Sequence, residues 1–235
     1  MKKRKFLSAV IAASIVLSSA TPIFTANSQG IDKLTLMTYA LVFSQKGVRN
    51  PRYMDIECGS EPGGGNCTNF VSQCLGDYRA GALQQKEYGW YPGNGSYANN
   101  NYWWYNASDS RSESWTSATA FGYYFKNSKR CSVKEYTNNN SAYKKIFKEI
   151  KTGDIIQLGE STSDMCHSII CVQRKVDKDG YGTILFAQNS DDKTYTMGKH
   201  QMKILCFTAD NWDFPSGWSY YKWKKIRLIK TSEAE

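Results

Sequence analysis

Hydrophobic patterns typical of helices come first along this chain of 235 residues, and patterns typical of strands follow them. Glycines end two of the helical segments, at Gly47 and Gly76, and serines suited to N-caps begin two others, at Ser114 and Ser141. Helices followed by antiparallel strands indicate an α+β fold, with the helices packed on a sheet. We expect helices at residues 34–46, 67–75, 114–126 and 141–150, and strands at 155–158, 167–172, 183–188, 203–207 and 221–229.

The first residues have the pattern of an export signal. A basic run from Lys2 to Lys5 precedes an apolar stretch from Phe6 to about Leu17 and then small residues. This order is typical of a secretory signal peptide, and the apolar part is shorter than the ~20 residues that a membrane-spanning helix needs. We therefore expect a signal peptide at residues 1–26, a single domain at 27–235, and a secreted or cell-wall-associated protein without a transmembrane segment after processing.

The charge of the mature chain bears on its partners. Four of the 30 Lys and Arg residues lie in the signal segment, so 26 basic side chains remain against 21 acidic ones, an excess of five. Such an excess favours anionic surfaces such as a bacterial wall or membrane. The chain has no basic stripe or nucleic-acid motif, so nucleic acid is not an expected partner. The sequence leaves the oligomeric state open.

Seven cysteines remain after processing, and an exported protein can keep disulfides. An odd number leaves at least one thiol unpaired within a monomer. The cysteines are Cys58, Cys67, Cys74, Cys131, Cys166, Cys171 and Cys206.

One of these thiols stands at the start of a predicted helix. In "GGGNCTNFVSQCL", residues 63–75, apolar residues recur from Cys67 to Leu75 with helical spacing, and Asn66 is suited to be the N-cap. Backbone N–H groups and the helix dipole in the first turn favour an anion, so the Cys67 thiol ionises more easily there. Cys67 is thus a candidate nucleophile. It also belongs to the apolar stripe, so a buried structural cysteine is the alternative interpretation.

A base for this thiol has to come from one of two histidines. His167 opens the strand-like run "HSIICVQRKV", and a turn at "DKDG" leads to a second run that ends at Asn189, which indicates a hairpin. A register that pairs His167 with Asn189 or Asp191 would let that side chain orient the imidazole, as a nucleophile–base–orienter triad requires. A strand-end histidine bonded to the backbone remains the alternative. His200 lies in a polar segment and is interpreted as a surface residue.

Five segments together carry a resemblance to a known family: "NCTNFVSQCL", "SESWT", "TGDIIQL", "CHSIICV" and "FAQNSDD". They resemble the putative amidase domain family, secreted proteins chiefly of Gram-positive bacteria that are related to CHAP and papain-like cysteine amidohydrolases. The resemblance covers most of the mature chain, to about residue 200. It implies a papain-like fold, with Cys67 as nucleophile, His167 as general base and acid, and Asn189 as third residue.

The chain departs from the family pattern at three positions. The family usually has Asp where this chain has Asn66, and His where it has Asn189; an Asn can still orient an imidazole. Cys166 stands where a polar residue is common, so a disulfide there would tie down the histidine strand. The implied substrate is an amide or peptide bond, such as one in peptidoglycan, cleaved without a metal or other cofactor.

Other residues are candidates for the oxyanion hole and for substrate binding. The backbone N–H of Cys67 is the natural first donor to an oxyanion, and Asn50, Tyr53 and Asn66 are candidates for a second. Trp115 of "SESWT" is a further substrate-binding candidate, and the aromatic residues between 88 and 105 could line a cleft for sugars or peptides. If that surface carries the function, the alternative is a catalytically inert secreted module that binds cell-wall glycan or peptide. A zinc site is not expected, because the chain has no CxxC pair.

Overall fold

The computed structural model describes residues 33–44, 48–56, 66–77, 102–129, 131–176, 182–189, 205–208 and 223–233. The helices are α1 (Lys33–Phe43), α2 (Asn66–Gly76), α3 (Glu113–Thr116), α4 (Ala118–Ser128) and α5 (Asn140–Glu149), with a short 3-10 turn at Thr231–Glu233. The strands are β1 (Tyr105–Ala107), β2 (Ser110–Arg111), β3 (Val133–Thr137), β4 (Ile155–Ser161), β5 (Asp164–Val176), β6 (Gly182–Ala187), β7 (Leu205–Thr208) and β8 (Lys225–Ile229).

A six-stranded sheet organises the described part of the chain. Its strand order is β3-β8-β4-β5-β6-β7, and every neighbouring pair is antiparallel. The last described strand, β8, lies between the edge strand β3 and β4, so the C-terminal segment is inserted one strand from the edge of the sheet. β1 and β2 form a separate two-stranded hairpin. The α+β class that the sequence predicts is confirmed.

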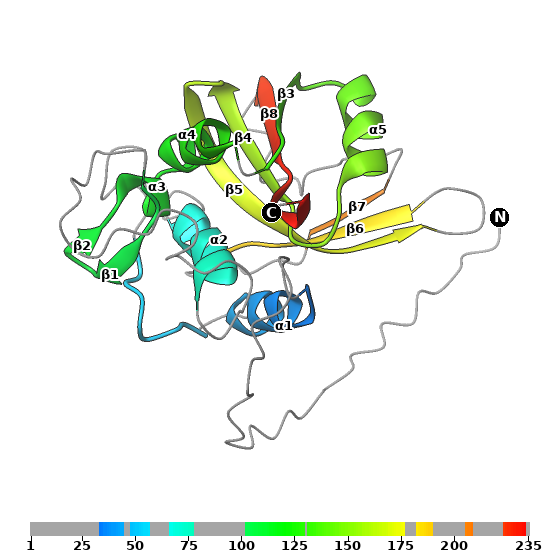
Figure 1. Ribbon diagram of the computed structural model, residues 1–235. Coiled ribbons are helices and arrows are strands. Elements are labelled where there is room, and N and C mark those ends of the chain that lie inside the picture. Colours follow the sequence, from blue (N-terminus) through cyan, green and yellow to red (C-terminus); the bar gives the residue numbers. More distant parts are fainter. Residues whose placement is uncertain are drawn as a thin grey trace, which may run out of the picture.

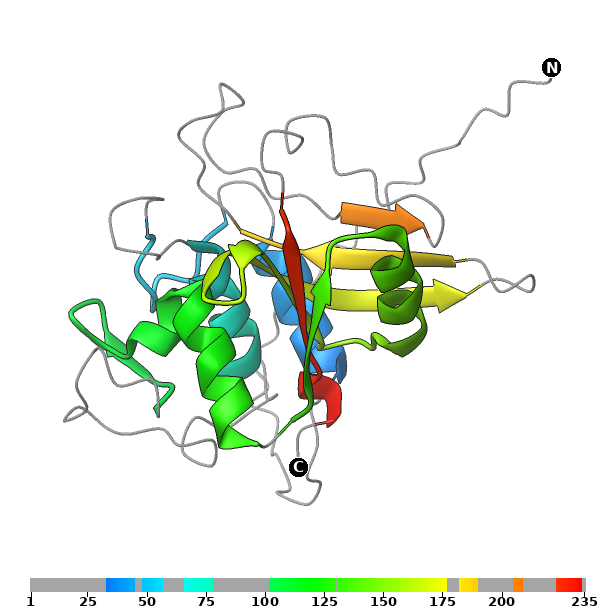
Figure 2. The ribbon, with the colours of Figure 1, turned by 90° about the horizontal axis from the view of Figure 1, so that it is seen from above.

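Helices cover both faces of the sheet (Figures 1 and 2). On one face, α1, α2 and α4 pack on alternate sheet residues such as Ile155 and Ile170. On the other face, α5 packs on the intervening residues such as Ile156 and Ile169. This alternation follows from the two-residue period of a strand, which sends successive side chains to opposite faces. Both faces are apolar, which explains why β4 and β5 read as continuous hydrophobic runs.

The helix that begins next to Cys67 lies in the middle of the packing. Every residue of α2 is buried, although Asn, Thr, Ser and Gln make up half of it. Its polar side chains are bonded inside the protein: Ser72 donates to the Trp115 carbonyl, 2.8 Å, and Asn69 to the Met54 carbonyl, 2.8 Å. Buried polar groups need such partners. The bonds fix α2 against its neighbours.

Several element boundaries differ from those that the sequence predicts. The helix predicted at 114–126 is two helices, α3 and α4, because Ser117 is extended and its hydroxyl caps α4 by accepting from Ala120 N–H. Asn139, rather than Ser141, caps α5. The prediction also missed β3, whose side chains are partly or fully exposed, and the short β1–β2 hairpin. Polar strands at an edge lack the apolar alternation that identifies strands in a sequence.

Some of the predictions concern residues outside the described ranges. These are the signal peptide at 1–26, the glycines before Asn66, Cys58, Asp191, His200 and most of the aromatic segment after residue 88. Among the described helices, none is long and apolar enough to cross a membrane.

Candidate active site

Cys67 occupies the first turn of α2, and its side chain is almost completely buried. Its sulfur lies 3.8 Å from Thr68 Oγ1 and 3.9 Å from the carbonyl oxygen of Cys166, the residue before His167. The helix α2 and the strand β5 are therefore in direct contact. The N–H groups in the first turn of a helix have no partners within the helix, which favours an anion at this position.

The imidazole of His167 lies between the sulfur and a carboxamide. Its Nε2 is 2.8 Å from Gln188 Oε1, and the ring hydrogen-bonds to the Cys67 sulfur. Because Gln188 occupies Nε2, Nδ1 is the ring nitrogen left for the sulfur. A carboxamide oxygen accepts, so Nε2 carries a proton. The three side chains form a row of sulfur, imidazole and amide.

The thiol of Cys67 is set up to ionise. Burial alone would raise its pKa, but the charge of His167 and hydrogen bonds from His167, the Ser168 backbone and Thr68 together lower the pKa below its ordinary value. An adjacent imidazole and hydrogen bonds to the charged form are the usual causes of such a shift.

Three other free thiols that the structure describes behave differently. Burial and the charge of Asp164 raise the pKa of Cys166 to about 11. Burial likewise raises the pKa of Cys74 and of Cys171. Cys166 is exposed and free, so the disulfide expected at this position is absent. Of these four thiols, only Cys67 has a pKa shifted towards the thiolate.

Gln188, and not Asn189, is the residue whose amide contacts His167. The strand register pairs Ile170 with Ala187 and Cys171 with Phe186, so odd residues of β5 share a face with even residues of β6. Continued past Ala187, this register puts Gln188 on the face of His167. The third position expected at Asn189 is therefore shifted by one residue. The sequence does not determine this parity, because the turn between the strands can be centred in more than one way.

Asn189 instead contacts Asn66, the residue before Cys67. Asn66 Nδ2 donates to Asn189 Oδ1, 2.8 Å, and Asn189 Nδ2 donates to the Phe43 carbonyl, 3.4 Å. Asn66 Oδ1 accepts from the Ile56 backbone N–H, 3.5 Å, and from the Asn69 side chain, 3.0 Å. Besides the bond to Asn69 within α2, the Asn66 side chain thus joins α2 to the segments of Ile56 and Asn189. These bonds hold the start of α2 in place.

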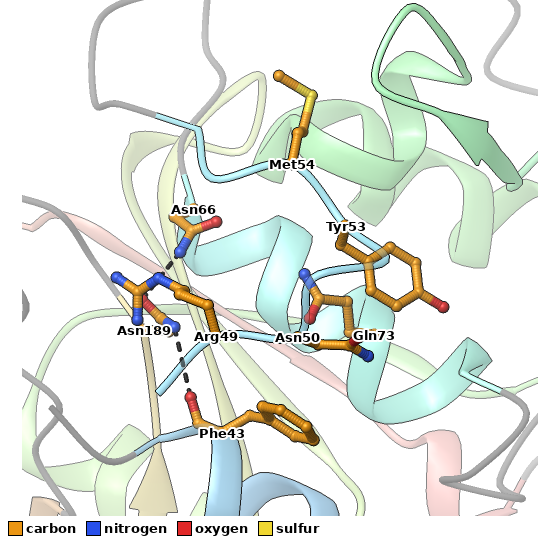
Figure 3. A pocket seen from close by; sticks show the side chains of 8 residues that line it. All are labelled: Phe43, Arg49, Asn50, Tyr53, Met54, Asn66, Gln73 and Asn189. Carbon is orange, nitrogen blue, oxygen red and sulfur yellow. Dashed lines mark hydrogen bonds between the residues drawn. The ribbon is translucent and has the colours of Figure 1, made fainter. Parts of the chain in front are cut away.

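A small pocket lies beside α2, and the three candidates for the second oxyanion donor, Asn50, Tyr53 and Asn66, all line it (Figure 3). Asn50 Nδ2 donates to Tyr39 Oη, 2.8 Å, and to Asp77 Oδ2, 3.1 Å, at the far end of α2 from Cys67. Ten residues of helix span about 15 Å, so Asn50 does not serve an oxyanion at Cys67. The lining residues are Phe43, Arg49, Asn50, Tyr53, Met54, Asn66, Gln73 and Asn189.

Tyr53 and Trp115 belong to the aromatic core. Tyr53 stacks on Trp115 with ring centroids 5.8 Å apart, and Trp115 stacks on Trp103 at 5.0 Å. Trp115 has no exposed surface, and its Nε1 donates to Asn69 Oδ1, 3.0 Å. A substrate cannot reach this ring, so the expectation that Trp115 binds substrate is wrong. Its role is to pack α3 against α2.

The described residues contain no group of three or more His, Cys, Asp or Glu side chains arranged to hold a metal ion. The chemistry available at the described site is that of a thiol, an imidazole and amides. This combination suits nucleophilic attack on a carbonyl group.

A family model described as "Putative amidase domain" matches residues 30–223, which include Cys67, His167 and Gln188. Neither a curated protein nor a solved structure matches the chain. The family model covers well over half of the chain and indicates amidase-type hydrolysis of an amide substrate. The chain belongs to the putative amidase domain family.

Proposed function

We propose that the protein is a cysteine amidohydrolase that cleaves an amide or peptide bond through a thioester on Cys67. The observation that carries the proposal is the contact of the Cys67 sulfur with His167, whose other ring nitrogen is held by Gln188 at 2.8 Å. A nucleophile, a base and an orienting group in this order define a catalytic triad by geometry rather than by fold.

The reaction proceeds in two halves. First, the Cys67 thiolate attacks the carbonyl carbon and forms an S–C bond; the C–N bond breaks, and the imidazolium of His167 gives its proton to the departing amine. Second, His167 takes a proton from water, whose oxygen attacks the thioester; the S–C bond breaks and the thiolate returns. The products are a free amine and a carboxylic acid, and no oxidant or cofactor is needed.

The first turn of α2 is suited to stabilise the oxyanion of both halves. The backbone N–H of Cys67 has no partner within the helix, because the four N-terminal N–H groups of a helix have none. It lies next to the sulfur and carries the partial positive charge of the helix N-terminus. This N–H is our candidate for the first oxyanion donor.

The proposed substrate is a peptide or peptidoglycan amide outside the cell. The signal-like N-terminal segment and the excess of positive charge support export to an anionic wall. The resemblance to secreted papain-like amidohydrolases supports the same location and suggests a papain-like architecture. The described arrangement of a thiol at a helix start and a histidine on an antiparallel strand is compatible with that architecture.

Purified peptidoglycan is the direct test. The full chain is incubated with it, and the released fragments are read by mass spectrometry for new amine and carboxyl ends. Cys67→Ala is expected to abolish release, whereas the control Cys166→Ala, which removes an exposed neighbouring thiol, is expected to retain it. Release by Cys67→Ala at the wild-type rate would reject the mechanism. Absence of new ends from any wall preparation would instead favour the binding module.

A further inference from the structure

A row of buried polar side chains leads away from the nucleophile. It begins at Thr68, next to Cys67 in α2, and continues through Ser168 of β5 and Gln157 of β4 to Arg227 of β8. All four side chains are completely buried. Burying so many polar groups is costly unless each is paired, so their arrangement needs a physical reason.

The links of the row have hydrogen-bond lengths. Thr68 Oγ1 lies 2.9 Å from Ser168 Oγ, and Gln157 Nε2 lies 3.1 Å from the same Ser168 oxygen. Arg227 Nη1 lies 3.0 Å from Gln157 Oε1. At the near end, Thr68 Oγ1 is 3.8 Å from the Cys67 sulfur.

The far end of the row is a charge that the protein keeps out of water. The Arg227 guanidinium has no exposed surface, and its Nε and Nη2 lie 3.1 Å and 3.0 Å from Glu135 Oε1. Its Nη2 also donates to the Thr162 carbonyl. Arginine has donors only, so Gln157 Oε1 must be the acceptor of the Arg227 bond.

This requirement sets the direction of every bond in the row. Gln157 Nε2 donates one hydrogen to the Ala118 carbonyl, 2.6 Å, which accepts only, and the other to Ser168 Oγ. The bonds to Arg227 and to the Ala118 carbonyl therefore require the same orientation of the Gln157 amide. Ser168 Oγ accepts from Gln157, so its own proton is available to Thr68 Oγ1. The proton of Thr68 is then left for the sulfur.

The packing of α4 leaves room for this row. A Cβ placed on Gly122 of α4 would lie 1.8 Å from Arg227 Nη1 and 2.6 Å from Gln157 Oε1. Only a residue without a side chain lets α4 approach the guanidinium and the amide this closely.

We propose that Thr68, Ser168, Gln157 and Arg227 form a directional hydrogen-bond relay that holds the Thr68 hydroxyl as a donor to the Cys67 thiolate. Arg227 is then a positioning residue for a sulfur that it does not touch. The inference rests on the proposed function, in which that thiolate is the nucleophile. Hydrogen bonds to an ionised acceptor are stronger than neutral ones, and burial strengthens them further.

Titration of Cys67 distinguishes the relay from a purely structural network. The full chain is alkylated with iodoacetamide across a range of pH, and the Cys67 peptide is quantified by mass spectrometry, without any amide substrate. Thr68→Val is expected to raise the apparent pKa of Cys67 by about half a unit to one unit, the size of one net hydrogen bond. Ser168→Ala is expected to shift it in the same direction by less.

The order of the relay gives a second expectation. Ser168→Ala should add nothing to the shift in a Thr68→Val background, because Thr68 is the only link from Ser168 Oγ to the sulfur in the relay. Gln157→Glu removes the donor to Ser168 while keeping the shape, so the serine proton turns towards residue 157 and the pKa of Cys67 rises. The single variants Ser168→Ala and Gln157→Glu carry the test if Thr68→Val does not fold.

Two buried hydroxyls outside the relay provide matched controls. Thr116→Val and Ser72→Ala each remove a completely buried hydroxyl near α2, and Ser72 bonds the Trp115 carbonyl instead of the relay. Both should leave the Cys67 titration unchanged even where they lower the melting temperature.

Three results would overturn the relay. First, Cys67 could have the wild-type pKa in the folded variants Thr68→Val, Ser168→Ala and Gln157→Glu. Second, the pKa shifts of Ser168→Ala and Thr68→Val could add in the double variant. Third, the control variants could shift the pKa of Cys67 by as much. An ordinary thiol pKa in the wild type would remove the relay and the proposed nucleophile together. A low wild-type pKa without shifts in the variants would remove the relay alone.

Discussion

At the scale of single residues, the pairing register of two strands decides which of two adjacent amide side chains bonds to His167. Cys67 and His167 follow from the sequence, because a helix start favours a thiolate and a strand start provides a base. Gln188 does not follow, because two adjacent amides, Gln188 and Asn189, end the same run, and their faces depend on the parity of pairing. The sequence also does not predict the contact between Thr68 and Ser168, because these residues are far apart in the chain and meet only in the folded protein.

The assignment of Gln188 gives a prediction about turnover. Gln188→Ala should lower kcat/KM about tenfold to a hundredfold, because general acid–base catalysis contributes about 10²–10⁴-fold and Gln188 only orients the ring. Asn189→Ala should cost less, since Asn189 bonds Asn66 and the Phe43 carbonyl. Initial rates on a peptidoglycan-derived amide compare them. If Asn189→Ala is the more damaging change in folded protein, the assignment returns to Asn189.

The lowered pKa of Cys67 predicts selective alkylation near neutral pH. The thiolate is the reactive form, so labelling of Cys67 should persist near neutrality and decline as the pH falls through its depressed pKa. Cys166 should label only as the pH approaches about 11. His167→Gln removes the imidazolium and should move the Cys67 profile to higher pH. Peptide-resolved iodoacetamide labelling measures all three, and equal profiles for the two cysteines would contradict the assignment.

At the scale of elements, the hydrophobic elements were easier to predict than the polar ones. The sequence predicts α2, α5, β4, β5 and β6 within a few residues, because their apolar residues repeat with one clear period. It misses β3, which pairs only with β8 in the sheet order and carries exposed polar residues. The break at Ser117 is also missed, because a serine cap inside a long helical pattern gives no stronger signal than any other serine.

The approach of α4 to the sheet gives a prediction whose sign opposes helix propensity. Gly→Ala inside a helix ordinarily stabilises it by about 1 kcal/mol. At Gly122 the new Cβ would collide with Arg227 and Gln157, so Gly122→Ala should destabilise the protein by about 1–3 kcal/mol or more. Urea denaturation measures the change, with Asn127→Ala at an exposed position of α4 as the control. A more stable Gly122→Ala variant would show that α4 can move away from the sheet.

At the scale of the whole molecule, the sheet separates two hydrophobic layers with different roles. Cys67 and Thr68 belong to α2, which lies with α1, α4 and the aromatic core around Trp115. The α5 helix covers the opposite face, to which the alternation of β5 assigns His167 together with Ile169. The sequence predicts helices on a sheet but not their division between faces. That division depends on crossovers, such as the passage of β8 between β3 and β4, which local patterns do not encode.

The hydrophobic cluster around α5 includes no residue of the candidate site, which predicts that its packing supports stability without shaping the site. Phe147→Ala on α5 removes a buried ring and should lower the free energy of unfolding by about 3 kcal/mol or more. Below the melting transition its Cys67 titration and kcat/KM should equal those of the wild type, because Phe147 packs in a cluster that includes none of Cys67, His167 and Gln188. Phe70→Ala, in α2 itself, removes a ring of the same size and should lower stability and also disturb both site measurements. Thermal unfolding and labelling on the same samples make the comparison. A loss of kcat/KM in folded Phe147→Ala as large as in Phe70→Ala would contradict this prediction. It would show that the two hydrophobic layers are coupled through the sheet and that the site depends on both.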